Sequence, residues 1–443
     1  MSEPVPNGAR GWISFVVLAA ITLVSPTPHA QAQDPPRTQQ PPQVQEPPQA
    51  QEPPGAPDPI DLSRVEELAR ERSSSFQELE ARYERDVFAA EGRFRPYNPV
   101  LGWDGEYLDE FGEGIWEHIV FVQQRVRLPG VGSRMRRVSE GQREGAALAR
   151  HRDEAVWLAD ARHAFVRTAL AEAELALLAR LDAVVDELRE AARLRAREGE
   201  ISGWELRLLE MGEYQLGSLV AERELEQAAR EQRWTSLMSL QEPGELRFDP
   251  HAALEGFLVP EEEELLAWVS EAPATRAARH QVELARREIS LEEGRRWSEL
   301  DLRAGYRQVS PEHRGFVLGT AIPLPLRDRN QPAIREARAE ERASELRADF
   351  QAAADRARVR ELHQTLLALD RRLEDFPSGL HDPETFVSTL IAVYEEGTES
   401  LSGTVSALTL LADTYRTWFD ELDGYFEAVF ELEALTGRRL LSP

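Results

Sequence analysis

Side chains that could do chemistry are scattered through this sequence without the spacing that catalysis or metal binding requires. Nine histidines are present, but none forms an HxxxH pair or joins a carboxylate cluster at ligand spacing. No GxSxG nucleophile elbow, Walker loop or GxGxxG loop occurs. The absence of cysteine excludes disulfides, thiolate metal sites and a cysteine nucleophile. We therefore expect no enzymatic activity, no cofactor and no bound metal.

Carboxylates are the abundant reactive group, and some of them gather around two glycine breaks. The 443 residues carry 79 Asp and Glu against 52 basic residues, all arginine, for a net charge of -27. This balance argues against a nucleic-acid partner. A surface rich in carboxylates would favour cations, although solubility and repulsion explain the same charge equally well. The run Glu261–Glu264 is expected to be the first turn of a helix, where the dipole favours acids.

Long helices are predicted to position these breaks. No proline occurs between Pro129 and Pro243, and Ala, Leu, Glu and Arg dominate that span. A first helix from about Ser133 to Glu198 would be roughly 100 Å long. The break at Glu198–Gly203 predicts the tip of a helical hairpin. A coiled-coil seam is predicted at Leu177, Leu181, Val184, Leu188 and Ala191.

The pattern returns in the second half of the chain, which indicates an internal duplication. Helical composition resumes after Pro332, breaks near Phe376–Gly379 and again at Glu396–Ser400, and continues to Gly437. Gly199 and Gly397 are 198 residues apart. We therefore expect one long helical hairpin in each half.

Strand-like sequence precedes each hairpin. Alternation is clear over Ser298–Arg307 and Gly315–Ile322, and looser around Leu101, Trp103 and Tyr107. The next segment, Ile115–Val126, does not reveal which of its faces is apolar. About ten residues suffice to cross an outer membrane at a tilt, yet a closed barrel needs at least about eight strands. The four strands of this chain would therefore have to join strands of other chains in one barrel, and three chains would supply twelve. Two amphipathic hairpins in a soluble domain explain the pattern equally well.

The N-terminus is predicted to direct export. Trp12–Val24 is an apolar segment and Ala30-Gln31-Ala32 a cleavage site, so residues 1–32 are interpreted as a signal peptide. A short membrane anchor is the alternative. Residues 33–62, rich in proline and glutamine, are expected to be a disordered spacer, with a recognition role for its PxxP motifs as the alternative.

Motifs at corresponding places in the two halves carry a resemblance to a known family. They are Asn98-Pro99-Val100-Leu101, Arg127-Leu128-Pro129-Gly130, Ala304-Gly305-Tyr306, Ile322 to Asn330 (IPLPLRDRN), the two glycine tips and Leu432 to Gly437. With these motifs, the sequence resembles the TolC-like outer-membrane efflux factor family, and IPLPLRDRN looks most like its heavy-metal branch. The resemblance covers about Val65 to Gly437.

The resemblance implies a fold class that is mainly α with a β membrane part. Duplicated long helical hairpins would form an α-barrel, and four strands per chain would contribute to a trimeric 12-stranded β-barrel. It also implies a homotrimeric exit duct in the outer membrane of a Gram-negative-type cell, in contact with outer-membrane lipid and with a periplasmic helical extension. The duct would work with a periplasmic adaptor and an inner-membrane transporter, and would export metal ions or small molecules.

The helix tips are the candidate site that the resemblance implies. Candidate adaptor contacts are Gly199, Ile201, Ser202, Glu205, Gly397, Ser400 and Gly403, and candidate gate residues are Glu198, Glu200, Glu395, Glu396 and Glu399. Family members often have an acid six positions after the tip glycine; Glu205 matches, but Gly403 stands at the second place. Without cysteine the chain also lacks the lipid anchor common in the metal branch.

The expected domains follow from these segments. They are 63–97 (N-terminal helix), 98–128 (first strand pair), 129–240 (first hairpin), 241–297 (equatorial segment and helix), 298–326 (second strand pair), 327–437 (second hairpin) and 438–443 (tail). A soluble periplasmic coiled-coil adaptor or scaffold is the alternative function. It explains the helices and the signal but not the strand pairs.

Overall fold

A computed structural model describes residues 59–92, 95–110, 113–255, 257–297, 299–309, 313–377, 380, 383–396 and 398–441. The expected signal peptide, the spacer up to residue 58 and the tip residue Gly397 lie outside the described residues. The last residues of the predicted disordered spacer, 59–62, are ordered instead, because Ile60 pairs with Leu246 and Leu62 is buried in the core. The chain divides into two units, Met1–Ala56 and Pro57–Pro443. All described residues belong to the second unit, which is the subject below.

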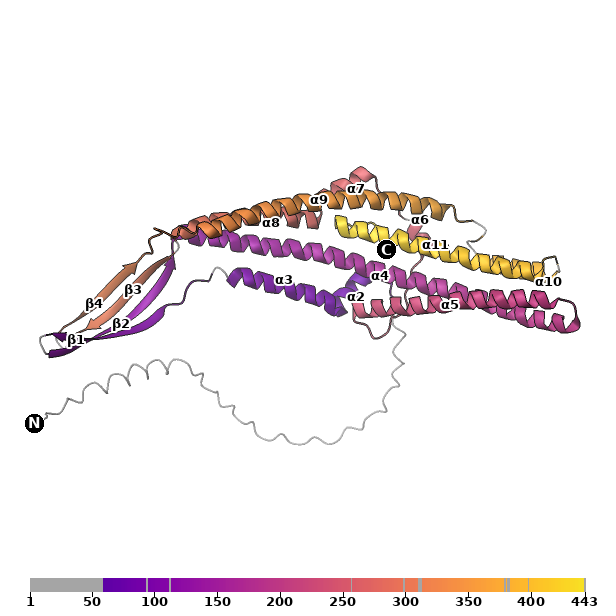
Figure 1. Ribbon diagram of the computed structural model, residues 1–443, viewed down its shortest axis with the longest axis horizontal. Coiled ribbons are helices and arrows are strands. Elements are labelled where there is room, and N and C mark those ends of the chain that lie inside the picture. Colours follow the sequence, from indigo (N-terminus) through magenta and orange to yellow (C-terminus); the bar gives the residue numbers. More distant parts are fainter. Residues whose placement is uncertain are drawn as a thin grey trace, which may run out of the picture. The chain divides into compact units, whose positions relative to one another are not determined.

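Long helices and one small sheet make up this unit (Figure 1). The helices are α2 (Val65–Arg72), α3 (Ser74–Gly92), α4 (Pro129–Glu198), α5 (Gly203–Met238), α6 (Pro250–Glu255), α7 (Glu262–Ser270), α8 (Pro273–Gly294), α9 (Gln331–Glu374), α10 (Pro383–Glu395) and α11 (Leu401–Thr436), with a 3-10 turn at Arg295–Trp297. The strands are β1 (Val100–Glu110), β2 (Glu113–Arg127), β3 (Glu299–Gln308) and β4 (Arg314–Ala321). Among the described helices, none combines the length and the apolar character that crossing a lipid bilayer would require.

The four strands pair in the order β1-β2-β3-β4, antiparallel throughout. The register aligns Trp103 with Val120, Val120 with Tyr306, and Tyr306 with Phe316. Residues directly opposite share a face, so the apolar face of β2 is the one bearing Val120, which the sequence alone did not reveal. These side chains are at least 40% exposed in the isolated chain, and Phe316 reaches 88%.

The opposite face of the sheet carries ion pairs. Arg307 donates to Glu117 at 2.7 Å, and Arg125 donates to Asp301 at 3.0 Å. Arg303 pairs with Asp104 across the intervening strand β2. The sheet therefore has one exposed apolar face and one charged face whose charges are largely paired.

The first hairpin consists of α4 and α5. Pro129 begins α4, where its missing N–H is not needed. The buried seam of α4 is Leu178, Leu181, Val185, Leu188 and Ala192, so three of the five predicted seam positions were wrong by one residue. Helix α4 packs on α5 and α11 together, and this wider apolar face also takes in Leu177 and Val184 as partly buried side chains.

Two pairs of helices meet end to end. The Ser73 hydroxyl donates to the Leu237 carbonyl at 2.7 Å, and the Ser74 N–H donates to the Ser239 hydroxyl at 3.0 Å, so α3 begins where α5 ends. In the second half, Gly437 after α11 lies against Pro273, the first residue of α8. The segment expected as one N-terminal helix is divided at Ser73, whose backbone is extended.

The second half also forms a helical hairpin, but its first arm is divided into two helices. Helices α9 and α10 are separated by residues 375–382 and together lead to the second tip, from which α11 returns. Helix α8 runs beside α4 and α9 (Figure 1). Many of the buried residues belong to α11. At the aromatic centre of the core, Phe248 from the segment before α6 contacts Phe165 of α4 and Phe426 of α11.

Candidate functional site

The first tip is closed by backbone geometry. Gly199 adopts φ +79°, a left-handed conformation that glycine adopts without strain. Its N–H donates to the Ala196 carbonyl at 3.2 Å, and the Glu200 N–H donates to Arg195 at 2.9 Å. These two bonds satisfy carbonyls that the end of α4 would otherwise leave unpaired.

The acid expected at this tip serves a structural purpose. The Ser202 hydroxyl accepts from the Glu205 N–H at 3.3 Å, and the Glu205 carboxylate accepts from the Ser202 N–H at 2.9 Å. This reciprocal pair is a capping box that starts α5. The S-x-x-E spacing carried that signal in the sequence, but the prediction assigned Glu205 only as a tip contact.

The second tip is capped differently. The Ser400 hydroxyl accepts from the Gly403 N–H at 3.1 Å, and the Ser400 N–H donates to Glu399 at 3.1 Å. A β-carbon at Gly403 would collide with the Glu399 carboxylate. Glycine at position 403 therefore leaves space for the carboxylate of Glu399, which precedes α11. At the first tip the corresponding acid, Glu205, lies within the helix.

The two tips contact each other through helices of different halves. The Arg195 guanidinium lies 5.1 Å from the centre of the Tyr394 ring. Further from the tips, Gly212 of α5 lies directly against Val405 of α11, close enough that a β-carbon at Gly212 would collide with the valine. The structure thus brings the tip of α4 and α5 beside the tip of α10 and α11.

Five tip carboxylates are exposed to solvent. They are Glu198, Glu200, Glu395, Glu396 and Glu399. No ion pair reaches any of them from the described residues, and no group of three or more potential ligands suited to a metal occurs in the same part of the chain. The arrangement concentrates negative charge at the tips without building a metal site.

Exposed apolar side chains on α5 escaped the sequence analysis. Trp204 is 65% exposed, Met211 59% and Tyr214 78%. At 100° per residue they fall on one side of the helix. Their spacing of seven and three residues was readable in the sequence, but nothing there says that the stripe stays uncovered within one chain.

Comparison with solved structures identifies the architecture. The CmeC outer membrane channel of Campylobacter jejuni superposes with a TM-score of 0.70 at 11% identity, over 86% of this chain and 87% of that chain. The outer membrane protein VceC of Vibrio cholerae gives 0.68 at 13%, over 85% and 96%. The open-state MtrE outer membrane channel of Neisseria gonorrhoeae gives 0.67 at 15%, over 86% and 89%. No family model and no curated protein matches the sequence significantly.

This chain has the fold of the TolC-like outer-membrane channels. The fold class predicted from the sequence, duplicated helical hairpins with four strands per chain, is confirmed at this level. Identities of 11–15% show the fold alone. They do not bear on the heavy-metal branch, which stays a prediction.

In this TolC-like fold, a buried charge network connects the two hairpins. Arg223 of α5 lies 3.0 Å from Glu174 of α4 and 3.2 Å from Asp420 of α11. One to two helical turns away, Asp423 of α11 lies 3.0 Å from Arg167 of α4 and 3.6 Å from Arg230 of α5. Each cluster therefore joins three helices from both halves of the chain.

The network perturbs the pKa values of its acids in opposite directions. Burial raises the pKa of Glu174 to about 7, against the attraction of Arg223. Burial also acts on Asp423, but His163, Arg167 and Arg230 outweigh it and lower the pKa of that carboxyl. Near neutral pH the cluster around Glu174 is therefore titratable, whereas Asp423 stays ionised.

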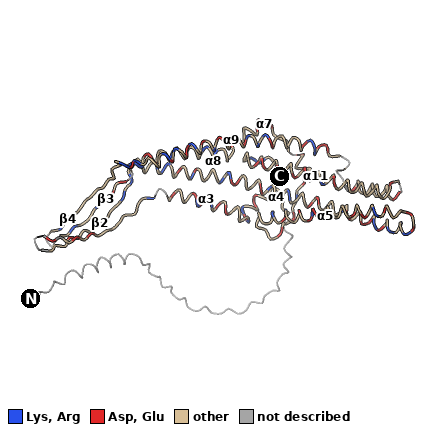
Figure 2. Tube along the Cα trace, in the orientation of Figure 1, with Lys and Arg blue, Asp and Glu red and all other residues tan. Residues whose placement is uncertain are grey.

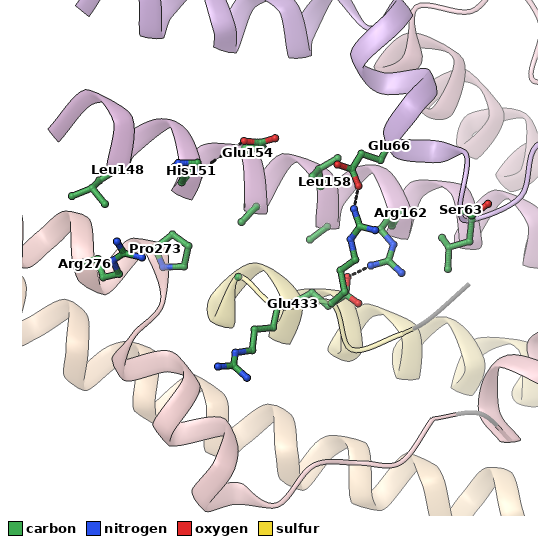
Figure 3. A pocket seen from close by; sticks show the side chains of 16 residues that line it. Ser63, Glu66, Leu148, His151, Glu154, Leu158, Arg162, Pro273, Arg276 and Glu433 are labelled. Carbon is green, nitrogen blue, oxygen red and sulfur yellow. Dashed lines mark hydrogen bonds and ion pairs between the residues drawn. The ribbon is translucent and has the colours of Figure 1, made fainter. Parts of the chain in front are cut away.

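A cavity of about 420 Å³ lies beside α4, the beginning of α8 and the end of α11 (Figure 3). Arg162 lines this cavity and donates to Glu433 at 2.5 Å and to the Leu441 carbonyl at 2.6 Å. Glu433 also accepts from the N–H groups of Leu440 and Leu441 at 2.8 and 3.0 Å. These bonds hold Leu440 and Leu441 against α4.

Proposed function

We propose that this chain is one protomer of a trimeric exit duct in the outer membrane of a Gram-negative-type cell. The observation that carries the proposal is the four-stranded sheet, whose apolar face is exposed and whose outer strands β1 and β4 have no further partner among the described strands. Unpaired strand edges are not tolerated in lipid. Three chains contributing four strands each would close a barrel of twelve.

The height of the apolar face supports this placement. On β2 the face runs from Trp116 to Val126, ten residue steps or roughly 33 Å along the strand. At a tilt of about 40° this corresponds to roughly 25 Å, the height of the apolar band of outer-membrane barrels. The charged face, with Arg307 paired to Glu117, would then line the water-filled interior.

The helices would form a periplasmic tube ending at the two tips. We infer that the tip residues meet a periplasmic adaptor and, through it, an inner-membrane transporter that supplies the energy. Exposed carboxylates at the tips and the exposed stripe from Trp204 to Tyr214 support a docking role. Opening would be a splaying of the tips biased by adaptor contact. The cargo would be metal ions or small molecules, with no covalent chemistry by the duct.

The proposal is tested on the protein expressed with its own N-terminus. Inner and outer membranes are separated, the protein is extracted with mild detergent, and the particle mass is measured by light scattering. A three-chain particle confined to the outer-membrane fraction is expected. A monomer or dimer released without detergent would refute the duct and support the soluble scaffold.

A further inference from the structure

The junction between the sheet and the helices contains a large cavity with a basic lining. Strand β2 passes into α4 here, β3 begins, and the segment after β4 leads to α9 (Figure 1). The cavity is about 980 Å³ and is lined by arginines, by exposed leucines and by Tyr97. Asn330, which precedes α9, is bonded to α8 at this junction, because its side chain donates to Glu292 at 2.7 Å.

Arginines at this junction stand out in an acidic chain. Five of them and no acid occur between Ile119 and Ser139, although the net charge of the chain is -27. Figure 2 marks this basic stretch at the start of α4. Among the cavity-lining residues, Arg296 and Arg327 are exposed, and neither forms an ion pair within the described part of the chain.

The two acids of the cavity, against four arginines, offset only part of this charge. The Glu299 carboxylate accepts from the Tyr97 hydroxyl at 2.5 Å and lies 3.4 Å from Arg125. The Asp328 carboxylate accepts from the Asn330 N–H at 2.9 Å. Arg127 lies over the Tyr97 ring at 4.4 Å. Glu299 is thus already paired, Asp328 keeps its charge, and the guanidinium groups of Arg296 and Arg327 remain without an ion-pair partner among the described residues.

An apolar surface continues directly from the cavity. Leu324 and Leu326 line it and are 66% and 77% exposed, and Ile322, two residues before them, is 49% exposed. This segment follows β4, whose apolar face bears Phe316 and Leu318. Trp297, next to Arg296, is 49% exposed; tryptophan at such a boundary is typical of a membrane interface.

We propose that this junction binds the head group of an anionic phospholipid in the leaflet that faces the periplasm. Arg296 and Arg327 would hold the phosphate, because guanidinium groups match its geometry. The acyl chains would lie against Leu324, Leu326 and the apolar face of β4. The inference rests on the proposed outer-membrane function, and it adds a specific lipid to that function.

The test measures lipid retained by the purified protein in detergent, by native mass spectrometry. Phosphatidylglycerol and phosphatidylcholine with identical acyl chains are offered separately, and inorganic phosphate is offered without lipid. The variant Arg296→Gln/Arg327→Gln is compared with Arg207→Gln/Arg356→Gln. The control removes the same charge from two exposed helical arginines that lie outside the cavity and form no ion pair within the described residues.

We expect the wild type and the control to retain phosphatidylglycerol in preference to phosphatidylcholine. The junction variant should lose about tenfold or more in apparent affinity for phosphatidylglycerol, since each arginine near an anionic lipid surface adds measurably to the binding free energy. A second variant, Leu324→Ser/Leu326→Ser, should bind phosphatidylglycerol more weakly. Its retention of inorganic phosphate offered without lipid should equal that of the wild type, because the arginines are unchanged.

Equal retention of the two lipids by the wild type, or an unchanged preference in the junction variant, would overturn the inference. So would full competition by millimolar inorganic phosphate, which would make this a free-anion site. Membrane fractionation separates the two proposals. A trimer in the outer membrane without lipid preference refutes this inference alone, whereas a soluble protein refutes the proposed function as well.

Discussion

Replacing Arg162 by methionine should destabilise the contact between α4 and α11. Arg162 and Glu433 are 8% and 6% exposed, and their side chains are joined at 2.5 Å. Methionine keeps the apolar stem and some of the packing on Phe430, whose ring lies 5.2 Å from the guanidinium. It removes the charge, however, and leaves the Glu433 carboxylate buried with only two backbone N–H donors.

The expected size of the effect follows from this burial. Removing one partner of a buried ion pair costs about 3–5 kcal/mol. Unfolding entropy of about 2.1 cal/mol/K per residue, over the roughly 390 residues of this unit, gives about 0.8 kcal/mol/K. The melting temperature should therefore fall by about 4–6 °C in thermal unfolding followed by circular dichroism.

The pH dependence provides a sharper check. Burial raises the pKa of Glu433, while Arg162 and the N–H groups of Leu441 and Leu440 lower it. Without Arg162 the folded-state pKa rises further above the unfolded value, so stability falls as pH rises through that window. The deficit of Arg162→Met should be smaller at pH 5 than at pH 8.

Two further variants decide whether the buried charge is the cause. Arg162→Met/Glu433→Met removes both charges and should regain a large part of the lost stability. Arg356→Met, at an exposed position of α9, should leave the melting temperature unchanged. A double variant no more stable than Arg162→Met, or a deficit that is the same at both pH values, would refute the reasoning.

Three other predictions concern the tips and the network. Gly199→Pro should abolish export in a cargo-efflux assay while trimers remain in the membrane, because proline cannot adopt φ +79° and lacks the N–H that bonds to Ala196; normal export would contradict the tip assignment. Gly212→Ala should lower the melting temperature through collision with Val405, and Val405→Ala in the same chain should restore it; no rescue would mean that α5 and α11 do not pack this closely. The wild type should lose stability as pH rises from about 4.5 to 7, the window set by the raised pKa of Glu174, and Glu174→Gln should flatten this slope in melting curves; an unchanged slope would assign it to other groups.

Local patterns predicted much of the fold. Alternation in β3 specified its apolar face, because Asp301, Arg303 and Arg307 alternate with Leu302 and Tyr306. In β4 the larger side chains Phe316 and Leu318 share a face because they alternate with glycine and valine. In β2 both faces contain large apolar side chains, Ile119 and Phe121 on one and Val120 and Val122 on the other. The pairing with β1 and β3 decides between them, and β3 lies more than a hundred residues away in the sequence.

Contacts between distant segments were beyond the sequence analysis. Arg162 and Glu433 are 271 residues apart and look like ordinary surface residues of helical stretches. The end-to-end contacts of α5 with α3, and of α11 with α8, depend on which helices the bundle brings together. The tip position of Gly199 was predictable because a left-handed position favours glycine, whereas the caps at the two tips combine several partners.

The unbroken length of α4 has a mechanical consequence. Its 70 residues make a covalently continuous helix of roughly 105 Å from the end of β2 to the first tip. The other routes between sheet and tips are each interrupted, at Ser73 and Ser239, at residues 375–382, or at Gly437 and Pro273. A displacement of the tips can be absorbed where these helices end, because the hydrogen-bond ladder of a helix stops at its last turn. Helix α4 then acts as a stiff rod that transmits load to the sheet, while the other three columns are jointed.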